Sequence, residues 1–343
     1  MELAAIQFLA LGAFLERNRS IHLGAKVTEW YSVYSVMPSE SAPRIALAPD
    51  TAPSWMLDAV IAGGGEVVPP AQAEGLIWAA PRKPEALKEV LHNASQIKWV
   101  QLPFAGIENF MHLIDEERLW TCAKGVYAEP VAEMALSLML AGMRGLNSYA
   151  RRASWSGPIG KNLHHANVTI FGGGGIAESL VRMLTPFDCR ITVVRNRVMD
   201  MVGVDEVLSS EHSTDALAGA DVVVLALALT PETEGMIGRD ELQSMKSDAW
   251  LINVGRGKHI VTDDLVWALE NKIIGGAGLD VTDPEPLSDG HPLWTMENCI
   301  ITPHVGNTPA MAVPLLGERI TTNVRHWAQG LDLLGPVYID LGY

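Results

Sequence analysis

The 343-residue chain is poor in basic residues, in cysteine and in long apolar runs. Its 25 Lys and Arg residues against 40 Asp and Glu residues give a formal net charge of −15, which disfavours nucleic acids and anionic membrane surfaces as partners. The three cysteines form no C-x-x-C pair and no Cys/His spacing typical of metal sites, so we predict reduced thiols in a cytoplasmic protein without a bound metal. An anionic substrate would need local arginines to overcome the overall negative field.

The N-terminus carries an apolar run, Leu3–Leu15, that is short for a membrane span. No basic residues precede it as they do in a signal peptide. The first clear strand pattern begins only at Arg44. We therefore expect residues 1–43 to be an N-terminal appendage, and residues 1–36 to be dispensable for folding and activity. The alternative is that its apolar face docks on the first domain.

The composition predicts a large core, because 48% of the residues are apolar. From Arg44 onward, short apolar runs alternate with segments of helical period, which predicts an α/β fold with doubly wound parallel sheets. The expected strands are residues 45–48, 75–78, 98–101, 167–171, 191–194, 221–226, 249–254, 276–280 and 299–302. The expected long helices are 54–62, 127–145 and 311–329. The second is so apolar that we expect it to lie between two domains.

A glycine-rich turn follows the buried strand 167–171 and leads into an apolar helical pattern. In a dinucleotide-binding turn the first glycine allows the tight bend, the second lets the backbone approach a pyrophosphate, and a small third residue packs helix on strand. Gly172, Gly174 and Ala177 stand at these positions. The pyrophosphate would sit on the helix N-terminus, where free N–H groups favour an anion. The residues expected to contact the cofactor here are Gly172, Gly174, Gly175 and Ile176.

Basic residues follow the next expected strand, 191–194. An NAD-binding domain usually has a carboxylate there, about 20 residues after the glycine turn, to bind the ribose hydroxyls. This chain has Arg195, Asn196 and Arg197 instead. Guanidinium groups pair well with a phosphate, so these residues predict that NADP is favoured over NAD. The alternative is a pair of solvated arginines at a strand end.

Three further segments follow expected strands of the second half, and doubly wound sheets bind ligands at the carboxyl ends of their strands. Glycines flank Arg256, which lets a tight turn present its guanidinium. Glu285 lies in a proline-rich loop, and His304 follows a proline. Each of these residues alone has an ordinary structural explanation, and only the joint pattern indicates a site.

The motifs together resemble those of the D-isomer-specific 2-hydroxyacid dehydrogenases, of the glyoxylate/hydroxypyruvate reductase type. They are GGGGIA from Gly172, TPET from Thr230, NVGRG from Asn253, LDVTDPEPL from Leu279, HPLW from His291 and ITPH from Ile301. The resemblance runs from about Arg44 to Tyr343. It implies a Rossmann NAD(P)-binding domain, 149–306, inserted in a discontinuous flavodoxin-like substrate domain, 44–148 with 307–343. Members of the family are usually homodimers.

The resemblance also implies roles for individual residues. The family's catalytic triad maps onto Arg256, Glu285 and His304. Arginine can hold a substrate carboxylate by two contacts, histidine can supply a proton near neutral pH, and a carboxylate beside the histidine orients it. The expected substrate-binding residues are Ala105, Gly106 and Arg256, and Thr230 and Asp280 are expected on the cofactor side. Asp280 could instead support the loop that carries Glu285. Formate dehydrogenases of this superfamily carry glutamine at position 285, so the glutamate argues against formate.

The resulting hypothesis is an oxidoreductase that moves a hydride between NAD(P)H and C2 of a small 2-oxo acid or D-2-hydroxy acid, with NADP favoured. One alternative is a nucleotide-sensing, corepressor-like interaction protein, since such proteins keep the same three residues. Another is a phosphoglycerate-type biosynthetic dehydrogenase, which would be expected to carry extra basic residues or a regulatory domain. The acidic composition favours the first hypothesis over the second.

Overall fold

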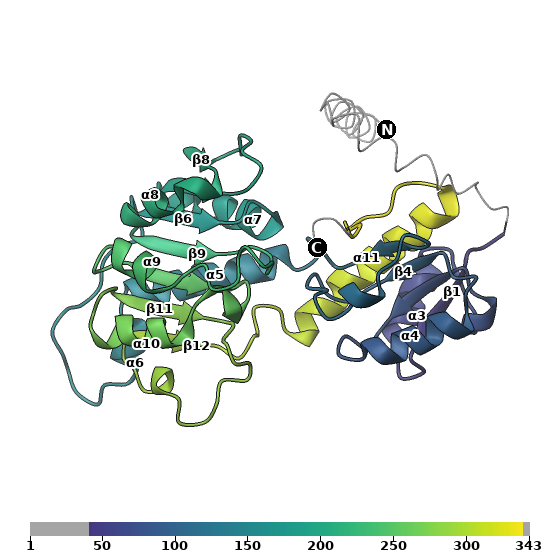
Figure 1. Ribbon diagram of the computed structural model, residues 1–343, viewed down its shortest axis with the longest axis horizontal. Coiled ribbons are helices and arrows are strands. Elements are labelled where there is room, and N and C mark those ends of the chain that lie inside the picture. Colours follow the sequence, from purple (N-terminus) through teal and green to yellow (C-terminus); the bar gives the residue numbers. More distant parts are fainter. Residues whose placement is uncertain (1–40, 339–343) are drawn as a thin grey trace, which may run out of the picture.

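A computed structural model of the protein describes residues 41–338. It contains two lobes, each built on a parallel sheet (Figure 1). The expected N-terminal appendage, residues 1–43, lies outside the described residues except for its last three, as do residues 339–343 of the expected return segment. None of the helices within 41–338 combines the length and apolar character needed to cross a bilayer.

The first lobe contains a five-stranded sheet in the order β2-β1-β3-β4-β5. All its pairings are parallel, and this order is that of flavodoxin-like folds. The strands are β1 (Arg44–Ala48), β2 (Glu66–Val67), β3 (Gly75–Trp78), β4 (Trp99–Gln101) and β5 (Leu119–Thr121). Helices α3 (Ser54–Ala62) and α4 (Pro84–Asn93) connect them.

The second lobe contains a seven-stranded parallel sheet in the order β12-β11-β10-β9-β6-β7-β8. From β8 to β11 this is the Rossmann order, in which the first strand lies at the centre. The strands are β6 (Asn167–Phe171), β7 (Arg190–Val194), β8 (Glu206–Leu208), β9 (Val222–Leu225), β10 (Trp250–Asn253), β11 (Gly276–Leu279) and β12 (Cys299–Ile301). The shorter helices are α7 (Gly175–Leu184), α8 (Ser213–Ala218), α9 (Arg239–Ser244) and α10 (Thr262–Glu270).

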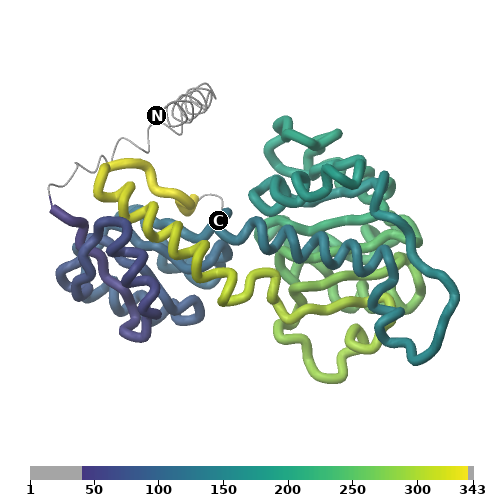
Figure 2. Tube along the Cα trace, turned by 180° about the vertical axis from the view of Figure 1, so that it is seen from behind, coloured from purple at the N-terminus to yellow at the C-terminus, as the bar shows by residue number. Residues whose placement is uncertain are grey.

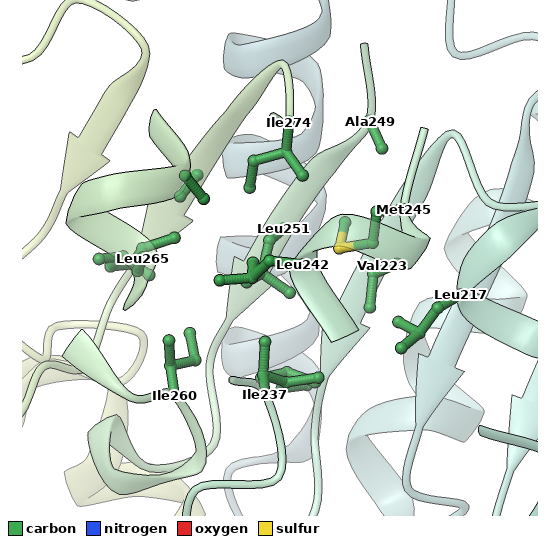
Figure 3. Packing of buried hydrophobic residues seen from close by; sticks show 14 of the residues in the cluster. Leu217, Val223, Ile237, Leu242, Met245, Ala249, Leu251, Ile260, Leu265 and Ile274 are labelled. Atoms are coloured by element: carbon green, nitrogen blue, oxygen red, sulfur yellow. The ribbon is translucent and has the colours of Figure 1, made fainter. Parts of the chain in front are cut away.

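Helices cover both faces of this sheet, which explains why its central strands are apolar at every position. On one face Val223 and Leu251 pack against residues of α8, α9 and α10 (Figure 3). On the other face Val224 and Ile252 pack against α7 and α5. Alternate residues of one strand therefore enter two separate cores. Each buried aliphatic side chain stabilises the fold by about 1.5–3 kcal/mol.

Helix α5 (Ala128–Met143) differs from its expected place between two domains. Its N-terminal end lies at the junction of the lobes, but its length runs along the seven-stranded sheet (Figure 2). Gly142 allows this close packing, since a Cβ there would lie 2.3 Å from the Trp250 ring. The apolar composition thus reflects burial against a sheet. The short helix α6 (Leu146–Ala150) follows it.

The C-terminal helix α11 (Pro309–Gln329) returns to the first lobe, where it packs against α3. The chain after it joins the sheet edge, where Cys122 N–H donates to the Gly335 carbonyl at 2.8 Å. All nine expected strands coincide with observed ones, and the fold class is confirmed. Three short strands, β2, β5 and β8, were not expected. The domain boundaries near 148 and 306 remain a prediction.

Candidate active site

The loops after β10, β11 and β12 meet at the carboxyl edge of the seven-stranded sheet. They carry Arg256, Glu285 and His304. The first two loops touch, because a Cβ at Gly257 would lie 2.0 Å from the Thr282 carbonyl oxygen. The second and third are joined by a hydrogen bond between Glu285 and His304. The three sequence-predicted residues therefore belong to one continuous surface of loops.

Asn253, at the end of β10, fixes the turn that presents Arg256. This fully buried amide accepts from Gly255 N–H at 3.0 Å and donates to the Arg256 carbonyl at 2.8 Å. The Arg256 guanidinium then donates from Nη1 to the Gly255 carbonyl at 2.8 Å and from Nε to Glu108 Oε1 at 3.0 Å. Glu108 belongs to the first lobe, so this ion pair joins the two lobes across the site.

His304 and Glu285 form the closest polar pair of the site, with Nδ1 of the ring 2.7 Å from Glu285 Oε1. The side chains remain 51% and 40% exposed, so a ligand can reach them. Nε2 of the ring forms no hydrogen bond with any described residue, which leaves that nitrogen available for exchange of a proton. The His304 backbone has φ of +54°, a left-handed conformation that its N–H bond to the Asp280 carbonyl at 2.8 Å helps to hold.

Asp280 is the anchor of the segment that carries His304. Its carboxylate is 3% exposed and accepts three hydrogen bonds from that segment. Oδ1 accepts from Thr302 Oγ1 at 2.6 Å and from Val305 N–H at 2.9 Å, and Oδ2 accepts from Gly306 N–H at 2.8 Å. These contacts make Asp280 a support of the segment that carries His304, and its expected place on the cofactor side stays a prediction.

Replacing Asp280 with asparagine should lower the free energy of unfolding by about 1–3 kcal/mol. Both carboxylate oxygens accept hydrogen bonds, and the asparagine NH₂ group would replace one of these acceptors with a donor. We expect a matching loss of kcat of several fold through displacement of His304. Denaturant unfolding and steady-state kinetics measure the two effects. Asp289→Asn in an exposed loop is the control, and equal stability of the two variants would contradict the anchoring role.

The glycine turn lies between β6 and α7, at the centre of the same sheet edge. Gly172 has φ of +105°, and a Cβ there would lie 2.4 Å from the Ala226 carbonyl oxygen, so only glycine fits. At Gly174, just before α7, a Cβ would meet nothing within 4 Å. Gly175 and Ile176 open the helix. An open helix N-terminus fits the pyrophosphate of a dinucleotide.

Arg195 lies directly against this turn. A Cβ at Gly173 would be 2.7 Å from both Cδ and Nε of Arg195, so the side chain crosses the glycines. Asn196 and Arg197, the other two residues of the expected set, are exposed. The structure thus brings one of the two expected arginines to the turn.

Thr230 lies in the loop after β9, next to the glycine turn. Its N–H donates to Thr233 Oγ1 at 2.8 Å, which in turn donates to the Ala228 carbonyl at 2.9 Å. Under the loop, His259 is fully buried with Nδ1 3.0 Å from the Thr233 carbonyl and Nε2 3.2 Å from that of Leu227. Burial lowers the pKa of His259. A lone histidine in the sequence gave no sign of this support.

The expected substrate loop after β4, with Ala105 and Gly106, faces Arg256. A Cβ at Gly106 would lie 1.6 Å from Arg256 Nη2, so the guanidinium rests on the backbone of this loop. Tyr127, which sequence reasoning missed, donates its hydroxyl to the Pro103 carbonyl at 2.9 Å and holds the loop from below. Burial raises the pKa of Tyr127 to about 12, so the phenol stays protonated as a donor.

The chain is similar in sequence to known proteins. Residues 135–306 match the family described as "D-isomer specific 2-hydroxyacid dehydrogenase, NAD binding domain". The chain is 39% identical to an uncharacterized protein from the proB 3' region of Corynebacterium melassecola, over 83% of this chain and 95% of that protein. It is 38% identical to human glyoxylate reductase/hydroxypyruvate reductase, over 53% of this chain and 58% of the human protein.

The fold is also similar to solved structures. One is a D-isomer specific 2-hydroxyacid dehydrogenase from Xanthobacter autotrophicus Py2 in complex with NADPH and MES, with a TM-score of 0.76. The match covers 88% of this chain and all of that one, at 22% identity.

Proposed function

Because the chain belongs to the D-isomer specific 2-hydroxyacid dehydrogenase family, we propose that it reduces a small 2-oxo acid of the glyoxylate or hydroxypyruvate type with NADPH. The reverse reaction oxidises the matching D-2-hydroxy acid. The observation that carries the proposal is the His304–Glu285 pair at 2.7 Å, beside a loop that presents Arg256 over the backbone of Gly106. This arrangement provides a proton donor and an anion site at one sheet edge.

NADPH, when bound, would supply the hydride for C2 of the 2-oxo acid. His304 donates a proton from Nε2 to the C2 oxygen, which becomes the hydroxyl group. Glu285 contacts Nδ1 and so fixes the orientation of the ring, with Nε2 left free. Arg256 and the N–H groups near Ala105 and Gly106 bind the substrate carboxylate, which places C2 for attack.

The cofactor would lie along the glycine turn, with its pyrophosphate on the N-terminus of α7. Gly174 leaves the open space that this requires. NADPH is the proposed reductant because Arg195 lies across Gly173, where a guanidinium can pair with the 2′-phosphate. Thr230 would line the opposite side. The Xanthobacter protein of similar fold is in complex with NADPH, which supports the same choice.

We also propose a domain division and an oligomeric state. Residues 44–148 and 307–343 would form the substrate domain, and residues 149–306 the cofactor domain. We expect a homodimer in the cytoplasm. Size-exclusion chromatography with light scattering tests the dimer.

Initial rates with a panel of 2-oxo acids, each with NADPH and with NADH, test the function. We expect turnover of glyoxylate, hydroxypyruvate or a close analogue, and none of formate with NADP. The readout is disappearance of reduced nicotinamide for the 2-oxo acids and its appearance for formate. Tight binding of NADPH without turnover of any 2-oxo acid would contradict the proposal and favour a nucleotide-sensing protein.

Gly106→Ala should lower kcat/KM for the 2-oxo acid by about tenfold and leave the folding stability nearly unchanged. The new methyl group would displace Arg256 Nη2 and Glu108 Oε2, the far ends of two flexible side chains, so the backbone has no reason to shift. A tenfold loss of kcat/KM corresponds to about 1.4 kcal/mol of lost transition-state binding, which the displacement of one binding group can cause. Gly219→Ala, where a Cβ meets nothing within 4 Å, is the matched control. Unchanged kinetics in the Gly106 variant would mean that Arg256 does not act from this position.

A further inference from the structure

Glu108 is a carboxylate at the site that the proposed mechanism leaves unused. It follows the substrate loop of the first lobe, two residues after Gly106. Its Oε1 accepts from Arg256 Nε at 3.0 Å, and the side chains of the pair are 41% and 34% exposed. The chain therefore places an anion of its own on the arginine that would receive the anionic substrate.

The pair fixes the orientation of the guanidinium. Glu108 engages Nε, and the Gly255 carbonyl engages Nη1 at 2.8 Å. Two acceptors on two nitrogens hold the planar group in one orientation. Nη2 then rests over Gly106, and no described residue accepts a hydrogen bond from it. The free N–H groups of Nη2 thus point to the substrate loop.

The same carboxylate lowers the positive charge at that point. A Cβ at Gly106 would lie 1.6 Å from Arg256 Nη2 and 2.8 Å from Glu108 Oε2, so the free nitrogen and the second carboxylate oxygen border the same space. An anion bound over Gly106 would be attracted by the guanidinium and repelled by Glu108. Glu108 therefore orients Arg256 and at the same time lowers the affinity of the site for an anion.

We propose that Glu108 is a positioning residue for Arg256 that also limits how tightly the site binds a carboxylate. The proposal rests on the proposed function in one respect, namely that the anion is the carboxylate of a 2-oxo acid. Glu108 aligns Nη2 with the substrate loop, and its charge keeps the binding of substrate and product weak enough for rapid exchange.

Two substitutions separate these roles. Glu108→Gln keeps an oxygen acceptor for Nε and removes the charge, whereas Glu108→Ala removes both. In the glutamine variant we expect kcat within about twofold of the parent and a KM two- to fivefold lower, the range for one exposed charge. In the alanine variant we expect kcat to fall about tenfold because the guanidinium is no longer aligned.

Binding of oxamate, an unreactive analogue of a 2-oxo acid, provides a readout without turnover. With NADPH present, its Kd should fall two- to fivefold in Glu108→Gln. In Glu108→Ala the Kd should be higher than in Glu108→Gln, because the alignment of Arg256 is lost as well as the charge. Glu117→Gln is the control. This exposed carboxylate precedes the amino end of β5, whereas the substrate loop follows the carboxyl end of β4. It should change neither kcat nor the Kd of oxamate.

The outcomes distinguish this inference from the proposed function. Equal kinetics of the glutamine and alanine variants would overturn the positioning role, and an unchanged oxamate Kd in Glu108→Gln would overturn the charge role. A parent protein that binds oxamate but reduces no 2-oxo acid would overturn the proposed function alone. A parent that neither binds oxamate nor reduces any 2-oxo acid would overturn both.

Discussion

Replacing His304 with alanine is expected to lower kcat about 10²–10⁴-fold, the range for loss of a general acid. Nδ1 of the ring is engaged by Glu285 at 2.7 Å, and Nε2 has no partner among the described residues. The variant therefore loses the proton donor without leaving a buried group unpaired, and folding and NADPH binding should persist. Steady-state kinetics and a binding titration with NADPH measure these effects.

Arg256→Ala should fail in a different way, with a raised KM and a lowered kcat together. The guanidinium would bind the carboxylate in the ground state and keep C2 placed in the transition state, so its loss affects both constants.

His92→Ala, on an exposed face of α4, is the control for His304→Ala. Near-normal kcat/KM in folded His304 and Arg256 variants would mean that the triad is wrongly assigned.

Replacing Arg195 with aspartate is expected to reverse the cofactor preference from NADPH to NADH. Its side chain lies across Gly173, within 2.7 Å of the position a Cβ would take there. A charge-assisted contact to the 2′-phosphate contributes about 1.5–3 kcal/mol, which is about tenfold or more in kcat/KM. Aspartate removes that contact and adds repulsion, so we expect the ratio of the two cofactors to change by at least about a hundredfold.

The measurement is kcat/KM for both cofactors in parent and variant at one ionic strength. Arg197→Asp should change the ratio less, because Arg197 is exposed two residues beyond the turn. Arg190→Asp, at the opposite end of β7, is the control for the charge change. Equal use of NADH and NADPH by the parent would contradict the role given to Arg195.

Most of the fold was predicted from patterns of residues that are adjacent in the sequence. The strand, glycine turn and helix around Gly172 are adjacent in sequence, and each step has its own residue preference. The missed strands have no comparable pattern. β2 and β8 are short edge strands that keep polar residues, since an edge strand is not buried on both faces, and β5 spans only Leu119–Thr121.

Sequence motifs indicated which candidate residues would lie together, but they did not reveal contacts that form only in the folded chain. Arg256, Glu285 and His304 follow successive strands, and parallel strands bring their carboxyl ends to one edge. Glu108 meets Arg256 across 148 residues and between two sheets, a pairing that no local spacing reveals.

Asp280 shows a second limit of sequence reasoning. Its place just before the Glu285 loop predicted either a support of that loop or a contact on the cofactor side, and the cofactor contact stays a prediction. Its role as an acceptor for Thr302, Val305 and Gly306 depends on the register of β11 with β12, which sets the loops side by side. Such a network is visible only when both strands are in place.

The most direct test of the account follows the hydride itself. NADPH deuterated at C4 of the nicotinamide, on the face that the enzyme uses, is incubated with hydroxypyruvate and the parent protein. The glycerate formed is analysed by mass spectrometry and chiral chromatography. The account predicts deuterium bound to C2 of the D isomer, and none when His304→Ala and Arg256→Ala are combined. Absence of deuterated product with either nicotinamide face labelled, or formation of the L isomer, would contradict it.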